Sequence, residues 1–195
     1  MTAATSPVDR THLHRNGTAL LGMMMFMASW AMLFSALFFA YFLVRQKALQ
    51  WPPEDLPTLP VMLPGLATAL LALSSAALQR GLNRIRGGLT GAAMNVGGAT
   101  ILGAAFLICQ VVLWQQLVGA GLVPASGTYA SIFYTFTVFH ALHVLIGVGA
   151  LMVLTVSAAR GRFKAESHIP LRLWTLYWHM VGVIWGLMFV TLFLL

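Results

Sequence analysis

Three histidines lie inside long apolar stretches of the chain: His140, His143 and His179. A ring nitrogen in hydrocarbon needs a partner, so these histidines indicate either a functional site within a membrane or a contact that holds helices together. The acidic residues all lie outside the apolar stretches, at Asp9, Glu54, Asp55 and Glu166. A proton relay across a membrane normally contains carboxylates, so the sequence argues against proton-pumping chemistry within this chain.

The spacing of the histidines leaves two interpretations open. His140 and His143 are three residues apart and project from one face of a helix, whereas His179 belongs to a later helix. His143 and His179 could supply both axial ligands of a b-type haem. Alternatively, the histidines form hydrogen bonds between helices, to a partner subunit or to lipid phosphate. The bulky neighbours Phe139 and Trp178 leave little room for a haem, which favours the second interpretation.

Composition places the histidines in a membrane protein. The 195 residues are 59% hydrophobic and 8% charged, whereas soluble domains are charged at about a quarter of their positions. Uncharged runs cover 16–44, 56–79, 87–159 and 173–195. A crossing needs about 20 apolar residues, so the third run is long enough for two helices, separated by the glycine- and proline-bearing interval 119–127. We predict an all-α, polytopic bundle of five transmembrane helices, over about 18–44, 59–79, 91–118, 129–158 and 173–195.

The basic residues predict how this bundle is oriented. Nine of the eleven fall on one side of the predicted membrane: Arg10, Arg15, Arg80, Arg84, Arg86, Arg160, Arg162, Lys164 and Arg172. Only Arg45 and Lys47 fall on the other. The positive-inside rule therefore predicts a cytoplasmic N-terminal segment, 1–17, ahead of the transmembrane domain, 18–195, with an external C-terminus. Topology thus explains the net charge of +7, and we expect no nucleic-acid partner.

Other kinds of chemistry find little support. The first apolar stretch far exceeds the core of about 7 to 15 residues of a signal peptide, so we expect it to stay in the mature protein. Cys109 is the sole cysteine, which excludes an internal disulfide and a cysteine-held metal site. A small carrier is a further alternative, disfavoured because the spans show no inverted repeat. Gln110 lies deepest among the polar residues of the third span and most needs a hydrogen-bond partner.

The residues around the histidines resemble a known family. The fourth span carries Phe139-His140-Ala141-Leu142-His143-Val144 and Gly147, and the fifth carries Tyr177-Trp178-His179-Met180-Val181-Gly182-Val183-Ile184-Trp185. These segments resemble the last two helices of subunit III of haem-copper respiratory oxidases, the cytochrome c oxidase subunit III family, whose typical forms read F-H-G-L-H-V-x-x-G and Y-W-H-F-V-D-V-V-W. The opening segment, with Gly22, Met23, Phe26, Ser29, Trp30, Tyr41 and Trp51-Pro52-Pro53, is also similar to that of the family.

The resemblance implies a non-catalytic accessory subunit without an active site, metal or cofactor of its own. It would bind subunits I and II, with haem and copper in subunit I, and would support assembly, stability and phospholipid binding. Five helices suit the shorter bacterial form, so the expected location is the bacterial inner (plasma) membrane. Third subunits of quinol oxidases and accessory proteins of nitric oxide reductases share the fold. The electron donor and the substrate of the complex therefore remain open.

The chain departs from the family pattern at its acidic positions. Family members usually carry Glu where Trp30, Leu113 and Arg172 stand, and Asp where Gly182 stands. Roles that these carboxylates play in the family do not carry over to this chain. We expect His140, His143, Trp178 and His179 to lie at a contact with another helix, a partner subunit or lipid. Arg172 is expected to be a cytoplasmic anchor at the membrane interface.

Overall fold

The structure, a computed structural model, describes residues 7–51, 53, 57, 59–163 and 168–195. Its long helices are α1 (Pro7–Lys47), α2 (Met62–Arg86), α3 (Ala92–Gly119), α4 (Thr128–Ala159) and α5 (Ile169–Phe189). A short 3-10 helix, η1 (Pro124–Ser126), precedes α4, and a π-helical turn, η2 (Val190–Leu194), continues α5. In the described part of the chain, five helices are long and apolar enough to cross a membrane, which confirms the predicted all-α, five-span fold.

The helices extend beyond the predicted spans where charged residues continue a helix after its apolar run has ended. α2 continues past Gln79 to Arg86, because arginine is a good helix former and ends an apolar run without ending the helix. For the same reason α1 already begins at Pro7, inside the segment predicted to precede the first span. The predicted break between the third and fourth spans is confirmed: α3 ends at Gly119, and Gly121 and Gly127 adopt positive φ angles of 90° and 130°. Lys164, one of the basic residues counted above, lies outside the described residues.

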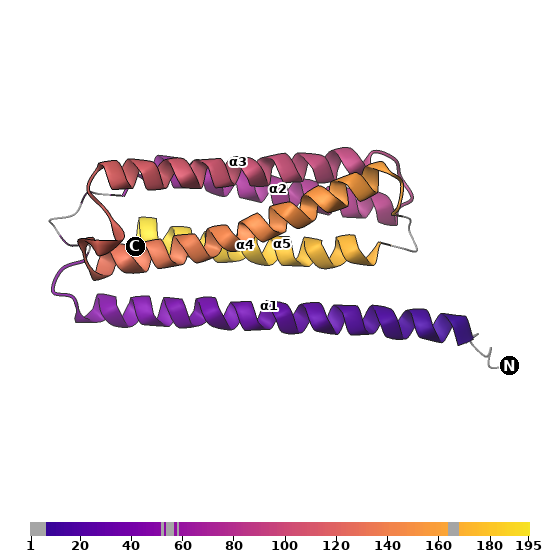
Figure 1. Cartoon of the computed structure of the whole chain (residues 1–195), viewed down its shortest axis with the longest axis horizontal. Coiled ribbons are helices and arrows are strands. Elements are labelled where there is room, and N and C mark those ends of the chain that lie inside the picture. Colours follow the sequence, from indigo (N-terminus) through magenta and orange to yellow (C-terminus); the bar gives the residue numbers. More distant parts are fainter. Residues whose placement is uncertain (1–6, 52, 54–56, 58, 164–167) are drawn as a thin grey trace.

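Four of the helices, α2 to α5, form a bundle, and α1 lies beside it (Figure 1). The start of α1, the α2–α3 connection and the start of α5 lie at one end of the molecule, and the α3–α4 connection and the C-terminus lie at the other (Figure 1). We call the first of these the arginine-rich end, because Arg80, Arg84, Arg160, Arg162 and Arg172 belong to it. The structure thus gathers on one end these five of the nine basic residues that the sequence analysis assigned to one side.

Small residues let α2 and α3 approach closely, and this pair forms the most extensive helix contact in the chain. A Cβ on Gly81 of α2 would lie 3.1 Å from Cγ2 of Val96 on α3. Thr100 of α3 is linked to Thr155 of α4 by a hydrogen bond of 3.0 Å between their hydroxyls. In lipid, such close packing and interhelical hydrogen bonds hold helices together, since the surroundings are as apolar as the side chains.

α1 is the most peripheral helix and runs beside α4 and α5 (Figure 1). Within it, Phe34 and Tyr41 are buried against the other helices. The Tyr41 hydroxyl donates to the carbonyl of Thr191 in η2 at 3.0 Å and accepts from Nε1 of Trp51 at 3.1 Å. Arg45 donates to the carbonyl of Leu195 at 2.8 Å. These bonds fasten α1 at the end of the molecule opposite the arginine-rich end.

Candidate functional site

Trp178 lies at the centre of the bundle and is fully buried. Its indole Nε1 donates to Oγ of Ser74 on α2 at 3.0 Å, and Ser74 donates in turn to the carbonyl of Ala99 on α3 at 2.7 Å. Its six-membered ring fills the space beside two glycines: a Cβ would approach it to 2.8 Å from Gly103 on α3 and to 2.5 Å from Gly147 on α4. One side chain of α5 thereby contacts three other helices.

His179, the next residue, faces α2 and uses both of its ring nitrogens. Nε2 lies 3.0 Å from Oε1 of Gln79, and Nδ1 is hydrogen-bonded to Oγ of Ser75. An amide oxygen only accepts, so Nε2 carries the proton and Nδ1 accepts from the Ser75 hydroxyl. Gln79 also donates from Nε2 to Oδ1 of Asn83 at 2.9 Å, which fixes the orientation of the amide. The imidazole is therefore a neutral link between α5 and α2.

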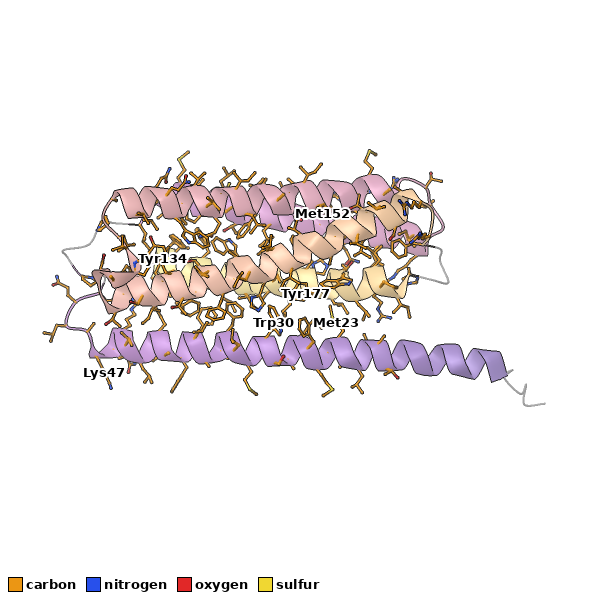
Figure 2. All side chains as sticks on the ribbon, viewed as in Figure 1. Met23, Trp30, Lys47, Tyr134, Met152 and Tyr177 are labelled. Atoms are coloured by element: carbon orange, nitrogen blue, oxygen red, sulfur yellow. The ribbon has the colours of Figure 1, made fainter. Side chains whose placement is uncertain are left out.

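His143 faces α1. Its ring meets Trp30 edge to face and lies 5.2 Å from the ring of Phe34, measured between centroids. Nδ1 donates to the carbonyl of Phe139 in its own helix, because a carbonyl can only accept. The backbone carbonyl of His143 accepts a hydrogen bond of 3.0 Å from the hydroxyl of Tyr177. Figure 2 shows Trp30 and Tyr177 between α1 and the other helices, so this cluster joins α1, α4 and α5.

His140 is enclosed by aromatic rings. The centroids of Phe34, Phe106 and Trp185 lie 6.2, 5.8 and 5.3 Å from that of the imidazole. These rings come from α1, α3 and α5, respectively. The side chain is only 1% exposed, and neither ring nitrogen has a hydrogen-bond partner in the structure. The sequence placed His140 and His143 on one face, and the structure gives them different surroundings, one apolar and enclosed, the other against α1.

The pair proposed for haem ligation does not share a common space. His143 faces α1, and His179 faces α2 with both nitrogens in hydrogen bonds. The described residues contain no group of three or more metal-binding side chains placed to hold an ion. The histidines thus lie at contacts between helices. Their predicted contacts with a partner subunit or with lipid stay predictions.

The four positions that depart from the acidic pattern have different surroundings. Trp30 packs on His143 and Tyr177, as described. Leu113 is buried in the core, at 1% exposed. Gly182 lines a groove of about 230 Å³ beside Ser75 and His179, and a Cβ there would have no neighbour within 4 Å. Arg172 lies exposed in the first turn of α5. Three of the substitutions thus leave an apolar or open position where the family pattern has an acid.

Sequence reasoning missed the hydroxyl-bearing face of α2. The hydroxyl of Thr68 accepts a hydrogen bond of 2.9 Å from Nε1 of Trp185. The hydroxyl of Ser74 accepts in the same way from Trp178, and the hydroxyl of Ser75 is bonded to His179. A signal was available for α5: Trp178 and Trp185 are seven residues apart and so lie on the same face of a helix, where each indole N–H needs an acceptor. Their acceptors Ser74 and Thr68 are six residues apart, so the choice of hydroxyls on α2 could not be taken from a matching spacing.

Comparison with known proteins shows which family the chain is similar to. The family model described as cytochrome c oxidase subunit III matches residues 3–195. The cytochrome c oxidase subunit 3 of Thermostichus vulcanus is 34% identical over 192 residues, which cover 96% of this chain and 92% of the relative. The corresponding protein of Synechocystis sp. is 33% identical and covers 90% of this chain and 75% of the relative. The probable cytochrome c oxidase subunit 3 of Nocardia farcinica is 31% identical, covering 98% and 96%.

Proposed function

The chain belongs to the cytochrome c oxidase subunit III family and is an accessory subunit of a haem-copper oxidase, and from that premise we propose that it binds oxidase subunits I and II and supports the assembly and stability of the catalytic subunit. Haem and copper would be held by subunit I, where oxygen is reduced. The observation that carries the proposal is the match to the subunit III family over residues 3–195, and the polar side chains Trp178 and His179 agree with it because they link helices to one another.

We propose that the chain lies in the bacterial inner membrane with its arginine-rich end in the cytoplasm. The five apolar helices support a multi-pass membrane protein. The orientation is supported by the nine basic residues that the sequence places on one side, against two on the other. Arg172 is exposed at the start of α5, which suits an anchor at the cytoplasmic membrane interface.

A phospholipid is the second proposed partner. A groove of about 390 Å³ runs between α4 and α5 at the arginine-rich end. Val153 and Leu154 supply an apolar wall for an acyl chain, and Arg162, Ser157 and Trp174 lie around the same groove. A guanidinium and a hydroxyl suit a lipid phosphate, and tryptophan favours the membrane interface. This chemistry supports binding of a phospholipid.

Copurification tests the proposed partners. The full chain, tagged at its N-terminus, would be extracted from native membranes in mild detergent. We expect a large haem-bearing subunit I and a subunit II in stoichiometric amount, with phospholipid retained in the same eluate. The electron-donor subunit would identify the complex as a cytochrome c or quinol oxidase, or as a nitric oxide reductase. A chain that elutes alone contradicts the accessory role, and a sharp Soret band in that fraction would support a bis-histidine cytochrome.

His179→Leu should reduce the amount of assembled complex without changing the haem spectrum of the complex that remains. The substitution leaves Ser75 and Gln79 without their partner, and interhelical hydrogen bonds in membranes contribute on average about 0.6 kcal/mol each. Yield and melting temperature would be measured beside the haem absorbance per complex. Asn83→Leu is a matched control, since it removes the outer hydrogen bond of Gln79 and leaves His179 in place. Loss of the haem signal from an intact complex would contradict the prediction.

A further inference from the structure

Within the part of the chain that the structure describes, three buried nitrogen atoms near the middle of the bundle have no hydrogen-bond partner: Nδ1 and Nε2 of His140 and Nε2 of Gln110. The two side chains are 1% and 2% exposed. Burying a polar group without a hydrogen bond is unfavourable, and proteins rarely leave such groups unpaired. An imidazole and an amide that are both fully enclosed therefore point to a ligand shared between them.

The register of α3 against α4 brings Gln110 and His140 to the same level of the bundle. The helices run in opposite directions (Figure 1). Nε1 of Trp114, one turn after Gln110, donates to the hydroxyl of Thr137 at 3.1 Å. One turn before Gln110, the ring of Phe106 contacts His140. Gln110 therefore lies between two contacts that α3 makes with Thr137 and His140, and it also lines a groove with Ala141.

We propose that Gln110 and His140 bind a single buried water molecule. The amide Nε2 is a donor, and a neutral imidazole has one donor and one acceptor nitrogen. A ligand that joins them must accept a hydrogen bond from the amide and either donate to the unprotonated imidazole nitrogen or accept from the protonated one, and water can do both. The water oxygen accepts from Gln110, and the water pairs with one nitrogen of His140, while the other ring nitrogen keeps its aromatic surroundings.

An ion fits the site poorly. Residues 87–159, which include α3 and α4, contain no charged side chain, and neither does the fifth span from 173 to 195. Phe34, Phe106 and Trp185 form the remaining walls around His140. An isolated ion would lose its hydration without gaining a counter-charge, whereas buried water is common in proteins, at about one molecule per 27 residues.

Gln110 also borders the outer surface of this helix pair. A groove of about 330 Å³ lies between α3 and α4, and Gln110 lines it together with apolar side chains such as Leu107, Val138 and Ala141 and with Trp114. Gln110 is the amide in this lining, so the proposed water lies next to the wall of the groove.

High-resolution electron microscopy of the full chain, purified from native membranes with its copurifying subunits, tests the site directly. We expect one density peak within hydrogen-bond distance of Nε2 of Gln110 and of a nitrogen of His140. The peak should be absent in Gln110→Met, which fills a similar volume without the amide. A map with no peak, or with the amide in direct contact with the imidazole, overturns the proposal. A peak that persists in Gln110→Met also overturns it, because the water would then not depend on Gln110.

A double substitution adds a readout that does not depend on density. Gln110→Met and His140→Phe should each lower the melting temperature, because each leaves the other group and the water with one partner fewer. The double variant should be no less stable than the less stable of the two single variants, since it removes the whole polar site. Gln116→Met, near the end of α3, is the control and should leave the effect of His140→Phe unchanged. Additive losses for Gln110 and His140 would contradict a shared ligand.

Discussion

Gly147→Ala is expected to destabilise the chain strongly, although it adds only one methyl group. The new Cβ would lie 2.5 Å from Cζ3 and 2.7 Å from Cε3 of Trp178. The indole cannot easily withdraw, because its Nε1 is hydrogen-bonded to Ser74 and its other side lies against Gly103. Overpacking of a core costs about 1–3 kcal/mol and occasionally more, and a rigid aromatic ring held on two sides favours the upper part of that range.

Gly149→Ala is the matched control, two residues further along the same helix. A Cβ at that position meets nothing within 4 Å, so we expect no loss of stability. A small gain is possible, because alanine favours a helix over glycine by up to about 1 kcal/mol. The melting temperature of the purified full chain and its amount in membranes would be compared for the two variants. Equal behaviour of Gly147→Ala and Gly149→Ala would show that Trp178 does not occupy the place described.

The fold was predictable because its main determinant, the length of uncharged runs, is local in sequence. The run 87–159 was correctly divided at the interval 119–127, where Gly121 and Gly127 adopt conformations that other residues avoid. The ends of α2 and α1 were less accessible. Arg80, Arg84 and Arg86 mark where the hydrocarbon ends, but they continue the helix, so the last turns of α2 could not be read from hydrophobicity.

The partners of the site residues were less predictable, because they depend on how the helices face one another. The sequence indicated that His179 needs a hydrogen-bond partner but not that Ser75 and Gln79 of α2 supply it. It did not show that Gly103 and Gly147 make room for one particular ring. Such pairings follow from helix rotation and tilt, which a single sequence does not encode in any local pattern.

The structure shows what surrounds the positions at which the family pattern has an acid and this chain does not. Trp30 lies against the ring of His143 and so gives that imidazole an aromatic neighbour where the family pattern has a carboxylate. Gly182 leaves open space beside His179, whose nitrogens are both engaged by α2. In this chain the histidines therefore face hydroxyl, amide and aromatic groups. The described contacts of His143 and His179 are those of packing and hydrogen bonding with these groups.

Trp178→Ala should cause a large loss of stability. The side chain is fully buried and contacts α2, α3 and α4 from α5. Truncation of a buried tryptophan or phenylalanine to alanine costs about 3–5 kcal/mol through lost contacts and the cavity that remains. We expect failure of the chain to accumulate in membranes, or a sharply lowered melting temperature. Trp174→Ala, one turn earlier on the same helix and only partly buried, should cost much less.

The combination of Trp178→Phe with Gly147→Ala separates shape from hydrogen bonding. Trp178→Phe removes the donor to Ser74, a bond whose net contribution is about 0.5–1.5 kcal/mol, and shortens the ring system. The shorter side chain makes room for the methyl group at position 147. The double variant should therefore be more stable than the sum of the two single effects predicts, by melting temperature of the full chain. Additive effects would mean that the two residues do not compete for the same space. Trp178 would then not explain why glycine stands at position 147, the last position of the V-x-x-G pattern in α4.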